Sequence, residues 1–125
     1  ALSSAASDVY KRQHIPMLWL GGAIAEPKVI DTYANQTDLA ATLLNQMGLP
    51  TDEFSFSKDI LNPCVPHYAF YTFNNGFGFI DESGVSVYDN EGNKILVEEP
   101  ESGNETRLEK GKVLLQTLYD DLGNR

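Results

Sequence analysis

The sequence has one cysteine, few basic residues and no long apolar run, and each shortage excludes a class of protein. A single cysteine, Cys64, among 125 residues rules out an internal disulfide. Lysine and arginine number 9 against 18 aspartates and glutamates, which gives a formal net charge of −9. Because nucleic acids and anionic membrane surfaces are bound largely through basic side chains, we expect neither as a partner. No apolar run approaches the roughly 20 residues that a membrane-spanning helix needs.

The clearest local pattern is a short helix between Asn35 and Gly48. Asn35 is a favourable N-cap residue, and Asp38 lies three residues further on, where a carboxylate can reach back to the cap. Gly48 can adopt the left-handed conformation that ends a helix, and Pro50 prevents its continuation. Apolar residues recur at three- and four-residue spacing and predict one buried face. These residues are Leu39, Ala40, Leu43, Leu44 and Met47.

Extended segments are expected on both sides of this helix. Residues 15–20 are apolar and are followed by Gly21-Gly22, which predicts a short buried strand and a turn. Further along, four antiparallel strands are expected, and Asn75-Gly76 is the strongest hairpin signal between them. The expected strands are 68–73, 77–80, 85–88 and 94–97.

A last helix is expected to cover one face of this small sheet, because a sheet alone would expose its apolar side. Gly123 would close this helix. Its apolar stripe would consist of Leu108, Leu115, Leu118, Tyr119 and Leu122. The residues from 98 to 106, which include Glu98, Glu99 and Glu101, are expected to form a solvated acidic loop.

Several stretches together resemble a known enzyme family. HIPMLWLGGAI at 14–24, NQTDLAATLLNQMG at 35–48 and SKDIL at 57–61 are similar to the carboxy-terminal part of sulfatase-type enzymes of the alkaline phosphatase superfamily. Within that superfamily the chain most resembles the lipoteichoic-acid synthase-like, or phosphoglycerol transferase, branch. FYTFNNGFGFID at 70–81 and KGKVLLQTLYDDL at 110–122 extend the resemblance toward the end of the chain.

The resemblance implies that the chain is a fragment of an α/β, alkaline phosphatase-like fold. Residues 14–62 would supply one central-sheet strand and its covering helix. Residues 63–125 would form a small four-stranded antiparallel sheet with a C-terminal helix. Residues 1–13 are left out of the fold, because SSAASDVYKRQ at 3–13 resembles the translation of a sequencing adapter. A natural flexible leader is the alternative, and we expect the authentic protein to begin further upstream.

The resembling enzymes hold a divalent metal, of manganese, calcium or zinc type, and attack phosphorus or sulfur with a hydroxyl nucleophile. Their metal and nucleophile motifs precede the stretches found here. The resemblance therefore assigns no catalytic residue and no metal ligand to this chain, which we expect to be inactive by itself. Its expected partner is the missing N-terminal catalytic portion of the same enzyme.

The parent enzyme would be metal-dependent, anchored in a membrane and active outside the cytoplasm, with no direct membrane contact from this segment. It would act on phosphodiester or sulfate ester bonds. The alternative is a free-standing α+β module that binds carbohydrate or another protein.

Few residues are candidates for a site. His14 is the one candidate for substrate binding, because it lies where the resemblance begins. His67 is more simply a packed residue, and Cys64 has no sequence neighbour that would activate its thiol, so we expect it to be buried. Residues 89–93 resemble a calcium loop only superficially, since the glycine is misplaced, and they predict a hairpin turn.

Aromatic residues in the first two strands of the expected sheet could form a stacking platform for sugars or bases. Strand alternation would turn half of them toward the core. The residues are Tyr68, Phe70, Tyr71, Phe73, Phe77 and Phe79.

Overall fold

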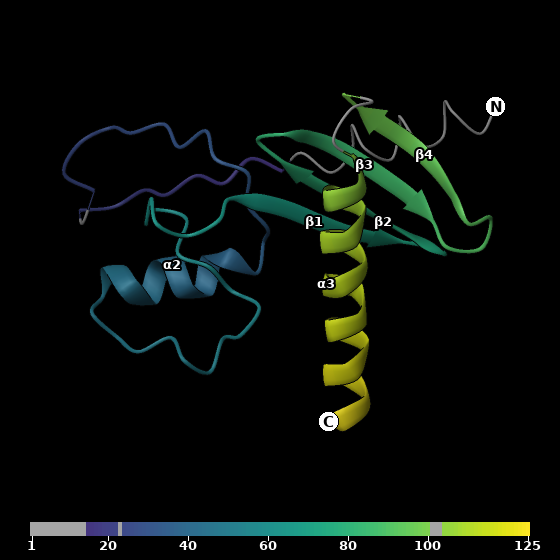
Figure 1. Ribbon diagram of the computed structural model, residues 1–125. Coiled ribbons are helices and arrows are strands. Elements are labelled where there is room, and N and C mark those ends of the chain that lie inside the picture. The colour runs from purple at the N-terminus through teal and green to yellow at the C-terminus, as the bar shows by residue number, and fades with distance from the viewer. Residues whose placement is uncertain (1–14, 23, 101–103) are drawn as a thin grey trace.

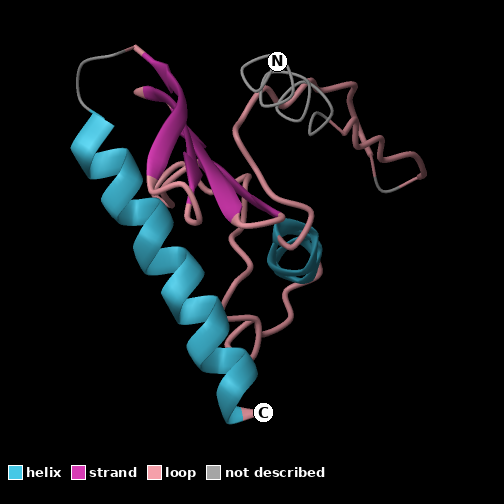
Figure 2. Cartoon of the chain, turned by 90° about the vertical axis from the view of Figure 1, so that its right-hand side faces the viewer, coloured by secondary structure: helices cyan, strands magenta, loops and turns pink. Residues whose placement is uncertain are grey.

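The computed structural model describes residues 15–22, 24–100 and 104–125, which form an α+β arrangement of two helices and one sheet (Figure 1). In chain order, the elements are α2 (Asp38–Gln46), β1 (Tyr68–Phe73), β2 (Gly76–Asp81), β3 (Gly84–Asp89), β4 (Lys94–Glu99) and α3 (Asn104–Asn124). Figure 2 shows α3 on one side of the strands and α2 on the other side, near their lower end. None of the described helices has the length and apolar content to span a bilayer.

The sheet is an antiparallel meander in the order β1-β2-β3-β4, as the sequence predicts. The first strand has the predicted bounds, and the other three are one or two residues longer at one or both ends. A register shift between Val87 and Tyr88 interrupts the β3–β4 pairing.

The hairpin prediction is correct, but its turn lies one residue earlier than Asn75-Gly76. Asn74 and Asn75 connect the strands, and Asn75 has a φ of 64°. Gly76 opens β2, directly opposite Phe73. A Cβ on Gly76 would lie 2.3 Å from the Phe73 ring and 2.4 Å from the carbonyl oxygen of Tyr88. Glycine is therefore needed here for close packing and not for a positive φ.

The aromatic residues of the first two strands are divided between the two faces of the sheet, as alternation predicts. Phe73 lies over Gly76, and Tyr71 lies over Gly78, each aromatic ring covering the glycine opposite it in register. On the other face Phe77 and Phe79 are buried. The aromatic set therefore forms no single open platform.

Helix α3 packs against the face that carries Phe77. Its closest approach is at Gly111, where a Cβ would lie 2.1 Å from the Phe77 ring. Three residues of the predicted stripe, Leu108, Leu115 and Leu118, are half-buried. Tyr119 and Leu122, also in that stripe, are 64% and 66% exposed, because the C-terminal turns extend beyond the sheet (Figures 1 and 2).

Gly123 does not close α3, contrary to the sequence prediction. The helix continues to Asn124, and Gly123 is not among the residues with a positive φ. A glycine ends a helix only where the chain turns away into the left-handed conformation. The prediction is correct for Gly48, whose φ is 67°. There Leu49 N–H donates to the carbonyl of Leu44 at 2.9 Å, in the pattern of a Schellman motif.

The predicted strand at 15–20 does not form. These residues have no regular secondary structure, and Ile15, Leu18 and Leu20 are 60%, 78% and 83% exposed. A strand is stabilised by hydrogen bonds and side-chain contacts with a neighbouring strand. No described strand pairs with this segment, so the expected central-sheet strand is wrong for this chain.

The predicted N-cap of α2 is also wrong. Asn35 does not cap the helix; its Oδ1 accepts a hydrogen bond from Phe70 N–H at 2.6 Å, at the outer edge of β1. Asp38 does reach back as predicted, and its Oδ2 accepts from Asn35 N–H at 2.7 Å. The side chain of Asn35 is thus used to hold α2 beside the sheet.

Two of the three buried residues of α2 are polar. Asp38, Ala41 and Thr42 are buried, whereas Leu39, Leu43 and Met47 are 42%, 44% and 62% exposed. We call these last three residues the α2 apolar stripe. The sequence predicted that all five apolar residues would be covered. Ala40 and Leu44 are half-buried, but in the described part of the chain nothing buries the α2 apolar stripe.

Candidate functional site

The residues singled out from the sequence are only partly described by the structure. His14 lies outside the described residues. His67 is half-buried, and its Nε2 is a buried atom with no hydrogen-bond partner among them. Cys64 is exposed, which corrects the expectation of a buried thiol. Its N–H donates to Asn62 Oδ1 at 3.0 Å, so it belongs to a surface turn between two prolines.

The acidic segment is partly structural. Glu98 belongs to β4, and its side chain is only 10% exposed because it pairs with Arg107. The loop expected from 98 to 106 is thus too long, because β4 includes Glu98 and Glu99 and α3 begins at Asn104. Glu98 is not solvated, Glu99 is exposed, and Glu101 lies outside the described residues. The turn between Asp89 and Lys94 is a hairpin turn, as the sequence predicts.

Arg107 is the centre of a buried polar cluster between α3 and the sheet, and its side chain is 1% exposed. Its Nε donates to Ser86 Oγ at 3.0 Å, and its Nη1 donates to Ser83 O at 2.9 Å. Its Nη2 donates to Pro100 O at 3.0 Å and forms the ion pair with Glu98. No sequence pattern identified this arginine, although it lies one helical turn before Gly111 on the sheet-facing side.

A second buried cluster joins α2 to the edge of the sheet. The Asp38 carboxylate, which is fully buried, accepts from Lys58 Nζ at 2.6 Å and from Lys58 N–H at 3.0 Å. The same ammonium lies 3.9 Å from the centre of the Tyr68 ring. Burial raises the pKa of the Tyr68 hydroxyl, and the negative charge of Asp38 raises it further.

Both clusters are better suited to holding elements together than to catalysis. Their charged atoms point at one another, and the side chains are at most 12% exposed, so a substrate has little access to them. No group of three histidine, cysteine, aspartate or glutamate side chains within 15–22, 24–100 and 104–125 could hold a metal ion.

Two surface hollows are more accessible. One, of about 570 Å³, lies between the proline-containing segment before β1, the β2–β3 turn and the start of α3. It includes His67 and the ion pair of Lys110 Nζ with Asp81 Oδ2 at 3.1 Å. Burial alone would raise the pKa of Asp81, but hydrogen bonds from Ser83 and Lys110 outweigh it and the pKa is lowered. The charged groups Asp81 and Lys110 therefore already satisfy each other.

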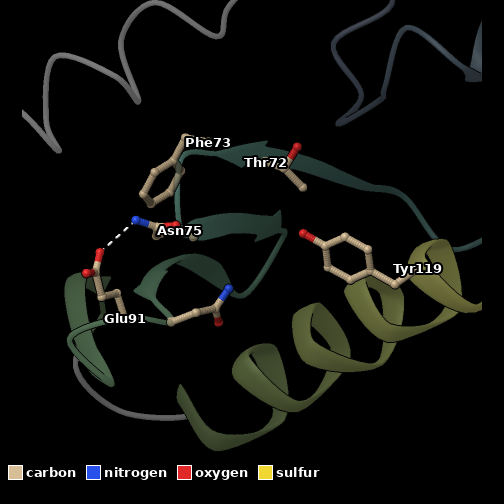
Figure 3. A pocket seen from close by; sticks show the side chains of 7 residues that line it. Thr72, Phe73, Asn75, Glu91 and Tyr119 are labelled. Carbon is tan, nitrogen blue, oxygen red and sulfur yellow. Dashed lines mark hydrogen bonds between the residues drawn. The ribbon is translucent and has the colours of Figure 1, made fainter.

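The other hollow, of about 430 Å³, lies at the end of the β1–β2 hairpin (Figure 3). We call it the hairpin-end hollow. It is lined by Thr72, Phe73, Asn75, Gly76, Asn90, Glu91 and Tyr119. No pattern in the sequence indicates a polar site at these residues. The two turns and α3 that meet here are far apart in the sequence, so no local pattern indicates the hollow.

Comparisons with family models, with curated proteins and with solved structures find no match to this chain.

Proposed function

We propose that this chain is the carboxy-terminal part of a metal-dependent, sulfatase-like or phosphoglycerol transferase-like enzyme of alkaline phosphatase-like fold. The enzyme would act on phosphodiester or sulfate ester bonds. The stretches at 14–24, 35–48 and 57–61 support this proposal by their resemblance to that family. Catalysis and metal binding are assigned to the part of the enzyme that precedes these stretches.

The observation that carries the proposal is the exposure of apolar side chains in two segments, 15–20 and α2. The α2 apolar stripe is exposed, and so are Ile15, Leu18 and Leu20. Full burial of one such side chain contributes about 1.5–3 kcal/mol, so covering these residues would stabilise the protein. A larger enzyme in which further layers cover both segments accounts for their exposure.

In this proposal the segment has a structural role. Its apolar side packs against the catalytic portion, while the Asp38–Lys58 cluster fastens α2 to the sheet of the C-terminal half. The parent enzyme is proposed to be anchored in a membrane with its catalytic domain outside the cytoplasm.

An activity assay tests the assignment of catalysis. The purified chain is incubated with phosphodiester and sulfate ester substrates, with and without manganese, calcium or zinc. We expect no metal-dependent turnover by the chain alone. Clear turnover that is abolished by a chelator would overturn the proposal.

A second candidate is a free-standing α+β module that binds carbohydrate or a protein, and the hairpin-end hollow favours it. Thermal unfolding and light scattering discriminate between the two. A monomer with a cooperative transition supports the module, whereas self-association through the apolar surface supports the enzyme fragment.

A further inference from the structure

The hairpin-end hollow brings together polar side chains from three separate elements. Thr72 comes from β1, Glu91 from the β3–β4 turn and Tyr119 from α3, and Figure 3 shows the Tyr119 hydroxyl directed toward the hairpin. The volume of about 430 Å³ falls within the range of small-molecule sites, about 300–1,000 Å³.

The floor of the hollow is held by hydrogen bonds between the two turns. Asn75 Nδ2 donates to Glu91 Oε2 at 2.7 Å (Figure 3), and Asn90 N–H donates to Asn75 O at 2.6 Å. The ring of Phe73 lies over Gly76. The arrangement is thus already formed without a ligand.

Several polar groups around this floor are left without a protein partner. The hydroxyls of Thr72 and Tyr119 and the side-chain amide of Asn90 form no hydrogen bond with any other described residue. A hydroxyl and an amide can each donate and accept. This combination suits a ligand whose own groups can also both donate and accept hydrogen bonds.

The charges of the lining restrict the class of ligand further. No lysine or arginine lines the hollow, so a phosphate, sulfate or carboxylate would lack a counter-charge. Glu91 is the single charged residue of the lining and is engaged by Asn75, and one carboxylate does not make a cation site. A neutral ligand is favoured.

We propose that the hairpin-end hollow binds a neutral sugar. The amide of Asn90 and the hydroxyls of Thr72 and Tyr119 meet its hydroxyl groups, and the ring of Tyr119 contacts an apolar C–H face. The site is complete within this chain, so it does not depend on whether the chain belongs to a larger enzyme.

Amide chemical shifts of the full chain test this site. Glucose and maltose are the neutral probes, and glucose 6-phosphate is the charged one. We expect saturable shifts at residues 72–76, 90–91 and 119 with a neutral probe, and weaker binding of the phosphate because of Glu91. No saturable shift with either neutral probe, or equal affinity for the phosphate, would overturn the proposal.

Substitutions at residues that line the hollow then test which side chains contact the sugar. Asn90→Ala and Tyr119→Phe each remove one hydrogen-bonding group and should weaken binding by about two- to tenfold. Tyr33→Phe makes the same change at an exposed tyrosine outside the hollow and should leave affinity unchanged. The dispersion of the same spectra reports whether each variant is folded. Should folded Asn90→Ala and Tyr119→Phe both bind like the wild type, the proposed site is wrong.

Discussion

Gly111 of α3 and Phe77 of β2 set the distance between the helix and the sheet. A Cβ on Gly111 would lie 2.1 Å from the Phe77 ring, far inside van der Waals contact, and Phe77 itself is fully buried. The ring has no free volume into which it could move. Helix α3 can therefore pack this closely only because residue 111 has no side chain.

Gly111→Ala should destabilise the chain. Alanine is the better helix former by about 1 kcal/mol, but the clash with Phe77 costs about 1–3 kcal/mol of overpacking. Gly123→Ala is the matched control, since nothing lies within 4 Å of the Cβ position at Gly123 in the same helix. We expect a lower denaturant midpoint for the first variant and an equal or higher one for the second. The reverse order would contradict the packing described here.

Arg107→Ala should cost about 3–5 kcal/mol of unfolding free energy, because it leaves the Glu98 carboxylate buried without its counter-charge. Arg125→Ala removes an arginine that pairs with Asp121 at the surface and should leave the unfolding midpoint unchanged. Chemical denaturation of both variants provides the comparison. Equal effects would show that burial of the Arg107 cluster contributes little.

We expect the chain to lose stability at alkaline pH because the Tyr68 hydroxyl is buried. Burial raises its folded-state pKa above 10.0. Below pH 10.0 the hydroxyl is neutral in both states and its contribution is complete. As pH rises, the unfolded state loses the proton first, so stability falls until pH passes the folded pKa. Tyr68→Phe should flatten this alkaline decline in the thermal midpoint, while Tyr33→Phe should not; an unchanged slope in Tyr68→Phe counts against the burial effect.

Leu43→Glu should reduce self-association of the isolated chain, because it places a charge in the α2 apolar stripe. Leu43 is already 44% exposed, so the substitution should cost little stability. Leu122→Glu makes the same change on α3, where Leu122 is 66% exposed, and should not alter self-association. Sedimentation velocity measures both. If the two variants behave alike, the stripe is not a specific contact surface.

The sequence alone determined the features that depend on neighbouring residues. Alternation and turn residues place the four strands, and Gly48 ends α2 where expected. These signals succeed because backbone conformation and strand period are local properties.

The tertiary structure alone decided which side of each element is buried. Asn35 binds an amide 35 residues away, and Asp38 binds Lys58, 20 residues away. Arg107 is buried because a serine and a glutamate of two strands surround it. Burial depends on partners that are distant in the chain, and a polar residue is buried only where such partners satisfy it. The local pattern of α2 therefore predicted a helix correctly and its buried face only in part.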